Sequence, residues 1–323
     1  MNLTPRIVLA AALLVPLLTS AASAQFHVSM NSLLMTRSSP NSATLLSNGA
    51  TAPSNAGAFF TAQQFDFDWK PGVEMTASTQ LTDAWAFEGR YFWLDDFTAT
   101  HVNRTVKPAG TADFFGATFT DVVGGTTTRG YFLTYQSDIQ GAEANSRLEL
   151  NDWLTFINGF RWLEIDEQLH GAFRSTPSVG PVDDVFKTQN DLWGGQLGFD
   201  VLLVERESIE VNLLAKTGAF GNFARGSALD LFPTPGFNSQ AFDTNTVAAF
   251  VGELRLDTTI WLTSNWGIHT GYNVLLVDGI ALASNQPWAT GNLATTTPTA
   301  PMQVNTNDTV IYQGGFLGFF GEF

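Results

Sequence analysis

The residues most able to do chemistry are charged side chains that alternate with apolar ones. They recur at every second position within several stretches of the sequence. Successive side chains of an extended strand point to opposite sides, so such charges share one face. Charges of both signs on a common face can pair with one another or select ions by sign. The eight acids of this set are Glu88, Asp138, Glu143, Glu149, Asp200, Glu210, Glu253 and Asp257, and the five bases are Arg90, Arg147, Arg161, Lys216 and Arg255.

Familiar catalytic motifs do not occur in the sequence. There is no Gly-x-Ser-x-Gly elbow, no His-Glu-x-x-His zinc helix and no Gly-Lys-Ser/Thr phosphate loop. A barrel protease would need His170 beside Asp166 together with a loop aspartate, Asp95 or Asp184. Because acids at an outer rim are usually only solvated, we predict that the chain is not an enzyme. We expect no catalytic residues, no metal site and no cofactor.

The composition excludes several other classes of protein. Among 323 residues, 15 are Lys or Arg and 30 are Asp or Glu, so the net charge is −15 and no nucleic-acid partner is expected. The absence of cysteine excludes disulfides, thiolate zinc sites and thiol catalysis. With 44% hydrophobic and 13% aromatic residues, the chain as a whole is not disordered.

The N-terminus has the features of a cleaved export signal. Arg6 supplies a positive charge, Ile7 to Leu18 form an apolar core, and Ala22-Ser23-Ala24 is a small-residue cleavage site. A membrane anchor would need about 20 apolar residues, which is longer than this run. We therefore predict a signal peptide at residues 1–24 and one barrel domain at residues 25–323.

Period-two alternation dominates the rest of the chain and predicts strands rather than helices. Strands that cross a membrane need roughly 9–11 residues, and the alternating stretches reach that length. We expect ten strands joined at one end by long loops rich in Gly, Pro, Thr and Asn. Their expected bounds are about 26–37, 59–81, 84–99, 126–150, 153–170, 189–204, 209–225, 247–262, 266–283 and 309–323.

The character of the two faces favours a membrane barrel. The polar face carries small residues with isolated charges, whereas the apolar face is bulky and aromatic at its ends, as in a lipid-facing wall around a polar lumen. The predicted fold class is all-β, an antiparallel up-and-down transmembrane β-barrel of about ten strands. The alternative is a soluble β-sandwich, which would pair a compact apolar face with a freely polar one.

Two strands break the pattern. Pro71-Gly72 interrupts the second expected strand and predicts a bulge there. In the fourth strand we expect the outward face to change near Gly141. Before this point the outward residues would be Tyr131, Leu133 and Tyr135, and after it Ala144, Leu148 and Leu150.

Tryptophan marks the short-turn end of the predicted barrel. Trp85, Trp153 and Trp266 each follow a short Asp/Asn/Ser turn, where an aromatic girdle at the membrane interface would lie. Short turns are periplasmic in outer-membrane barrels. The last strand ends at Phe323, and a terminal aromatic after alternating residues is similar to the signal that the barrel-assembly machinery reads.

Several short segments resemble a known family. Gly159-Phe160-Arg161-Trp162-Leu163-Glu164, Trp193-Gly194-Gly195-Gln196-Leu197-Gly198 and Lys216-Thr217-Gly218-Ala219-Phe220 look like pieces of the type-7 beta-barrel porins, a group of bacterial outer-membrane proteins. The similarity is strongest from about Gly141 to Phe223. The resemblance implies a porin-like outer-membrane barrel and no catalytic residues.

The sequence therefore predicts a narrow passive porin for small solutes or ions, located in the outer membrane of a Gram-negative-type envelope. Eight acids against five bases predict a mild cation preference. The pore-lining candidates are Glu88, Arg90, Glu143, Arg147, Glu149, Arg161, Asp200, Lys216, Glu253, Arg255 and Asp257. The alternative is a non-conducting structural or surface-interaction barrel with a charge-filled lumen. The expected partners are outer-membrane lipid, the barrel-assembly machinery and small solutes or ions.

Overall fold

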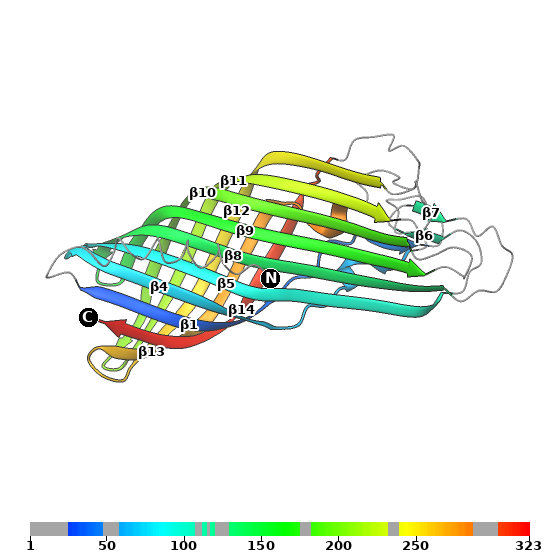
Figure 1. Ribbon diagram of the computed structural model, residues 1–323. Helices are drawn as coiled ribbons and strands as arrows, with labels where there is room; N and C mark the ends of the chain where they lie inside the picture. Colours follow the sequence, from blue (N-terminus) through cyan, green and yellow to red (C-terminus); the bar gives the residue numbers. More distant parts are fainter. Residues whose placement is uncertain are drawn as a thin grey trace.

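Ten antiparallel strands close into a barrel in a computed structural model that describes residues 25–47, 58–106, 112–114, 117–119, 129–174, 182–231, 239–286 and 303–323 (Figure 1). The predicted signal peptide at residues 1–24 lies outside these described residues. Around the barrel the strands follow the order β1-β14-β13-β12-β11-β10-β9-β8-β5-β4. The predicted fold class and strand number of the barrel are confirmed.

The barrel strands differ in length. They are β1 (Phe26–Arg37), β4 (Lys70–Thr82), β5 (Trp85–Val106), β8 (Arg129–Asn151), β9 (Leu154–Arg174), β10 (Val182–Arg206), β11 (Ile209–Leu231), β12 (Ser239–Trp261), β13 (Trp266–Ile280) and β14 (Asp308–Glu322). The connections contain a small sheet of β2 (Thr44–Ser47), β3 (Ala58–Thr61), β6 (Ala112–Phe114) and β7 (Ala117–Phe119), and the short helices η2 (Ala62–Gln64) and η3 (Ala283–Asn285).

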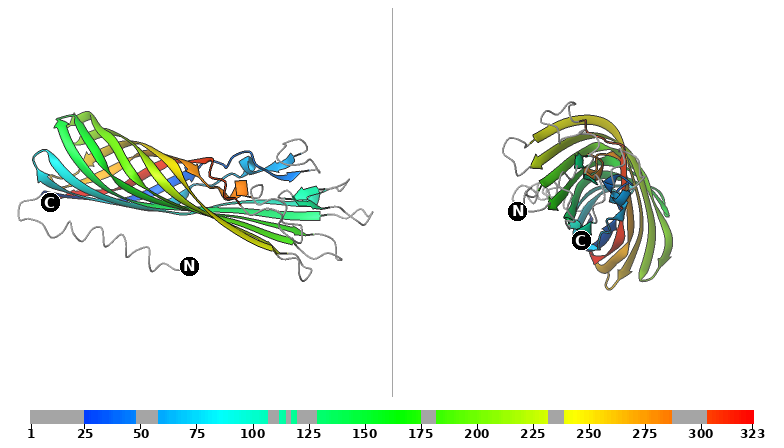
Figure 2. Two further views of the ribbon diagram at one scale, coloured as in Figure 1. Left: turned by 90° about the horizontal axis from the view of Figure 1, so that it is seen from above. Right: turned by 90° about the vertical axis from the view of Figure 1, so that its right-hand side faces the viewer.

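The six neighbouring strands β5 and β8 to β12 have 21 to 25 residues each and extend well beyond the other four (Figure 2). We call the part that extends away from the short turns the distal wall: residues 97–106, 129–140, 164–174, 182–191, 225–231 and 239–248. Much of this wall was expected to form loops. Its polar outer residues look like loop sequence, but backbone pairing with the neighbouring strands keeps them extended.

The outer surface near the short turns is apolar. Large side chains there are about half exposed, among them Leu197 at 55%, Phe199 at 47% and Leu254 at 51%. Along β9 and β10 the outward residues are apolar up to Trp162 and Trp193 and polar farther from the short turns. These two tryptophans pack against each other. We call the surface between these tryptophans and the short turns the apolar belt.

The expected change of face in the fourth strand is wrong. The β8–β9 register runs from Gly130 to Glu149 without a shift, so Tyr131, Leu133 and Tyr135 point inward, like Glu143. By the same alternation Asp138, predicted to face the lumen, points outward. The irregularity lies in β5 instead, where the register with β8 shifts between Leu94 and Phe97.

The expected bulge at Pro71-Gly72 is also not found. β1 pairs with β4 in continuous register through Leu34↔Pro71 and Leu33↔Gly72. The register shift of β4 against β5 lies near the turn instead, between Gln80 and Thr82. The strand therefore accommodates Pro71 close to its beginning, a position that proline tolerates.

The lumen at the distal end is filled by the chain itself. Phe60, Phe65 and Phe67, from the connection between β1 and β4, are buried, and the latter two rings contact Tyr135. On the other side Gly279, at a φ of 80°, forms a bulge at the end of β13. After this bulge Ala281, Leu282 and Ala283 are completely buried.

Candidate functional site

Eight charged side chains meet inside the barrel at the level of the apolar belt. Strand alternation directs them inward, and their ion pairs connect β4, β5, β8, β9, β11 and β12. Four are acids and four are bases, so their formal charges cancel. We call this set the ionic cluster: Glu74, Arg90, Glu143, Arg161, Lys216, Glu253, Arg255 and Asp257.

The ionic cluster spans the lumen from wall to wall. Arg90 lies on β5 and Glu253 on β12, and these strands are five places apart in both directions around the ten-stranded barrel. Nevertheless, Arg90 Nη1 donates to Glu253 Oε1 at 2.7 Å. Arg161, from a third strand, donates to both Glu143 and Glu253. Side chains from opposite walls therefore close the interior.

Each carboxylate of the ionic cluster has several partners. Glu143 accepts from Lys216 Nζ at 2.6 Å and from Gln196 Nε2 at 2.8 Å, in addition to its bonds with Arg90 and Arg161. These side chains are at most 6% exposed. Buried ions are tolerated only when pairing and further hydrogen bonds replace the lost hydration.

Glu74 joins the ionic cluster from β4. Its carboxylate binds Arg90 Nη2 and Arg255 Nη1, both at 2.6 Å, and accepts from Asn31 Nδ2 at 3.0 Å. Sequence reasoning missed Glu74. The signal was present, since Glu74 alternates with outward Val73 and Met75, but the expected bulge at Pro71-Gly72 obscured the phase.

A polar vestibule of about 400 Å³ lies between the ionic cluster and the short turns. At its side Arg147 pairs with Glu88 at 2.9 Å and also with Asp200. His269 Nε2 lies 3.4 Å from Asp257 Oδ1. Glu149, which is exposed, also lines the vestibule.

The lumen changes character on the distal side of the ionic cluster. The inward residues there are apolar, and the small void between them and the ionic cluster measures about 10 Å³, too little for more than one water molecule. Buried apolar side chains around and above this void include Leu33, Met35, Phe92, Leu94, Ile139, Leu163, Ile165, Leu275 and Val277. Along the barrel axis, the vestibule is therefore followed by the ionic cluster and then by this apolar layer.

Farther along, inward polar side chains of the distal wall hold the segment after β13. Asn190 donates to Ala281 O at 2.9 Å and accepts from Ala281 N at 2.8 Å. Glu167 accepts from Ala283 N at 3.0 Å and also binds Arg37 and Tyr135. We call this segment, residues 279–286, the inner clasp.

Asp308, at the start of β14, fastens the inner clasp beyond the end of the apolar belt. Its carboxylate accepts from Asn285 Nδ2 at 3.2 Å and from Leu282 N at 3.3 Å. Burial raises the pKa of Asp308 to about 6, although these hydrogen bonds act in the opposite direction. The carboxyl group that fastens the inner clasp therefore has a pKa raised above its ordinary value.

The structure places the eleven pore-lining candidates on the inner side of the barrel, but in two groups. Seven belong to the ionic cluster, and Glu88, Glu149, Arg147 and Asp200 line the vestibule. Trp85, Trp153 and Trp266 are about half exposed beside the short turns. Phe323, 62% exposed, packs edge-on against Trp266.

Comparison with known structures identifies the class of fold. The outer membrane protease OmpT from Escherichia coli matches with a TM-score of 0.51 at 10% identity, over 94% of this chain and 97% of that one. The translocator domain of autotransporter NalP from Neisseria meningitidis matches with 0.40 at 8% identity, over 98% and 95%. The P. putida toluene transporter TodX matches with 0.31 at 9% identity, over 94% and 90%.

The protein therefore has the fold of outer-membrane β-barrels. At such identities the likeness shows the fold alone. No family model and no curated protein matches the chain, so the resemblance to the type-7 porins stays a prediction beyond this fold class. Among the described residues no helix is long and apolar enough to cross a membrane.

The prediction that the chain is not an enzyme is overturned by the comparison with OmpT. The exclusion assumed that a barrel of this kind serves passage or structure, whereas an outer membrane protease shares the fold. Of the residues expected for a protease, His170 lies 3.3 Å from Asp183 rather than beside a loop aspartate. Asp184 points inward and is buried, and Asp166 points outward from β9.

Proposed function

We propose that this protein is an outer-membrane barrel whose lumen is closed and whose distal wall serves interactions at the cell surface. The single observation that carries the proposal is the Arg90–Glu253 ion pair, which joins opposite walls at 2.7 Å. Lipid surrounds the apolar belt, and the barrel-assembly machinery recognises the strand that ends at Phe323.

Three successive layers support closure. The ionic cluster fills the lumen within the apolar belt, the apolar layer above it leaves a void of about 10 Å³, and the inner clasp and buried phenylalanines occupy the distal end. A barrel of eight strands is just filled by its side chains, and ten strands add little width. Because the layers are stacked along the axis, moving one of them would not open the other two.

The narrow porin with mild cation preference is the competing hypothesis. It would require the eight charges to separate and leave a hydrated path between them. Their balance of four acids and four bases also weakens the expected preference for cations, since sign selection needs an excess of one charge. The acidic excess of the interior lies instead at the vestibule, with Glu88, Glu149, Asp200 and Glu210.

Planar-bilayer recording of the refolded protein tests the proposal. Folding is verified first by the shift in electrophoretic mobility between heated and unheated samples. The closed barrel is expected to give no conductance steps above the baseline. Reproducible conductance steps, with a higher permeability to K⁺ than to Cl⁻, would refute closure and establish the porin instead.

A second candidate function is surface proteolysis. The observation that favours it is the His170–Asp183 contact at 3.3 Å on the distal wall, since a carboxylate can orient an imidazole for acid–base work. Peptide cleavage by the folded protein, lost on His170→Ala and retained in Gln168→Ala, would establish it. Cleavage that is equal in both variants would exclude His170 as the responsible group.

A further inference from the structure

The outer face of the distal wall carries two adjacent rows of polar side chains beyond the tryptophans, and one further row lies between them and the tryptophans. The strand register aligns the first row across β8 to β12 as Asp138, Asp166, Gln189, Arg225 and Thr244. Each member lies directly opposite the next. With about 4.8 Å between neighbouring strands, the row is about 19 Å long.

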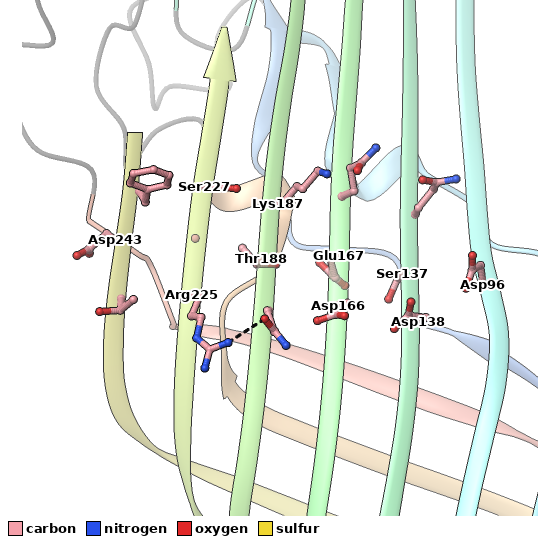
Figure 3. A pocket seen from close by; sticks show the side chains of 16 residues that line it. Asp96, Ser137, Asp138, Asp166, Glu167, Lys187, Thr188, Arg225, Ser227 and Asp243 are labelled. Atoms are coloured by element: carbon pink, nitrogen blue, oxygen red, sulfur yellow. Dashed lines mark hydrogen bonds between the residues drawn. The ribbon is translucent and has the colours of Figure 1, made fainter. Parts of the chain in front are cut away.

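The second row lies one side-chain step farther from the belt. It consists of Gln136, Gln168, Lys187, Ser227 and Phe242, again placed opposite one another by the register. Both rows line a groove of about 520 Å³ across the wall, which also takes in Asp96 from β5 (Figure 3). Phe242 is 67% exposed at one end of the second row.

The groove is polarised along its length. Asp138 and Asp166, opposite each other on β8 and β9, make one end acidic. Lys187 and Arg225 are diagonal neighbours on β10 and β11 and make the other part basic. Arg225 is 59% exposed and uses Nη1 to donate to Gln189 Oε1 at 3.1 Å (Figure 3). Its Nη2 lies 3.7 Å from Asp191 Oδ2, and the guanidinium group stays largely exposed.

These side chains suit a sugar that bears a phosphate. Carboxylates and amide oxygens accept hydrogen bonds from hydroxyl groups, and amide nitrogens donate to them. Guanidinium and ammonium groups bind phosphate, and Arg225 and Lys187 supply one of each on neighbouring strands. A simple polyanion would be repelled by the aspartates, so a ligand with both hydroxyl groups and a localised negative charge fits better.

The position of the groove selects the source of that ligand. Between the groove and the apolar belt lies one row that contains Glu164 and Asp191. The next row toward the short turns contains Trp162 and Trp193, at the edge of the apolar belt. Tryptophan marks the level where hydrocarbon meets headgroups. The groove therefore stands at the height of lipid headgroups, next to the surface that lipid already covers under the proposed function.

We propose that this groove binds the phosphorylated saccharide headgroup of an outer-leaflet glycolipid. The phosphate lies on Lys187 and Arg225, and sugar hydroxyls donate to Asp138 and Asp166. This inference rests on the membrane location in the proposed function but is independent of whether the lumen is closed.

The test uses the full-length folded protein in nanodiscs of neutral phospholipid with one of three additions. These are a bisphosphorylated lipid A-type glycolipid, its dephosphorylated form, or an anionic phospholipid without sugar. Bound lipid is counted by native mass spectrometry. We expect the phosphorylated glycolipid to bind at least 10-fold more tightly than either other lipid.

Two variants locate the site. Lys187→Ala/Arg225→Ala is expected to reduce binding of the phosphorylated glycolipid about 10-fold, whereas Arg206→Ala, at a short turn near the opposite end, leaves it unchanged. Asp138→Ala/Asp166→Ala should weaken the dephosphorylated form as well. Equal binding of the glycolipid and the sugar-free anionic lipid, or a double variant indistinguishable from Arg206→Ala, would overturn the proposal. Conductance of the same variants in planar bilayers reports on closure separately.

Discussion

The two halves of the barrel have opposite interiors and opposite exteriors. Within the apolar belt the outside is apolar and the inside holds the ionic cluster, whereas the distal wall is mainly polar outside and mainly apolar inside, with a few buried polar groups. The change occurs along continuous strands, since β8 carries Tyr135 and Glu143 on the same inner face. The surrounding solvent therefore dictates the outer face, and each interior is filled by whatever side chains can satisfy one another.

The stability of the two interiors rests on different forces. In the distal half, apolar burial stabilises the interior as in a soluble protein. In the belt half, pairing of the buried charges recovers little more free energy than their loss of hydration costs. Removing one partner leaves a buried charge unpaired in a medium of low dielectric constant, so the charges are stable only as a complete set. The comparison predicts that single substitutions in the ionic cluster are the most damaging.

The largest effect is expected for Glu143→Ala. It leaves Arg161 and Lys216 with a reduced set of partners in a buried site, which should cost about 3–5 kcal/mol. Unfolding in urea, followed by electrophoretic mobility, measures the loss. Glu149→Ala is the matched control, because this acid is also inward on β8 but exposed, and it should change stability by less than about 0.5 kcal/mol. Equal losses would contradict the role of the ionic cluster.

The outer faces differ in their tolerance of charge. Leu254→Arg places a cation in the apolar belt and should cost about 2–4 kcal/mol and reduce assembly in the membrane. Thr244→Arg, outward on the same strand but beyond the belt, should assemble normally. Comparison of folded protein in membrane fractions checks both, and normal levels of Leu254→Arg would show that the belt is misplaced.

A smaller effect is expected from the polar bonds of the distal interior. Tyr135→Phe removes the hydroxyl that donates to Glu167 and should cost about 1.5–3 kcal/mol, because the acceptor is charged. Tyr272→Phe removes an exposed hydroxyl that donates to Gln313, and it should leave the free energy of unfolding nearly unchanged. Urea unfolding of the two variants gives the difference, and identical midpoints would mean that the buried bond contributes nothing.

The comparison explains which predictions from the sequence succeeded. Alternation placed the eleven pore-lining candidates on the inner side, because a lipid-facing wall must be apolar on the other side, but it also sent Asp138 inward, and this residue points outward. The same rule failed at Tyr131, Leu133 and Tyr135, which it sent outward. Apolar residues face lipid only within the belt, and a single sequence does not mark where the belt ends.

Which charges pair within the ionic cluster could not be predicted from the sequence, for a different reason. Alternation fixes which way Arg90 and Glu253 point, but their meeting depends on the barrel closing with β5 opposite β12. The lengths of β5 and β9 to β12 were underestimated because polar outer residues in the distal wall resemble loops. In both cases the missing information was the pairing of distant strands.

The smallest effect concerns the inner clasp. The pKa of Asp308 is about 6 when folded and near 3.9 when unfolded, so the folded state binds the proton more tightly. The contribution of Asp308 to stability is therefore greatest below about pH 4 and declines as pH rises from about 4 to 6. We expect hydrogen exchange of the Leu282 and Ala283 amides to be slower at pH 5 than at pH 7, after correction for the intrinsic rate. Asp308→Asn should abolish the difference, and its persistence would exclude Asp308.

The most direct test of the closed lumen is the reactivity of single cysteines, since the native chain has none. Ser78→Cys lies in the vestibule and Asn273→Cys borders the small void beyond the ionic cluster. A charged, water-soluble thiol reagent should modify Ser78→Cys within seconds and leave Asn273→Cys unmodified while the barrel stays folded. Equal modification of both cysteines would show a hydrated path through the ionic cluster and would contradict closure.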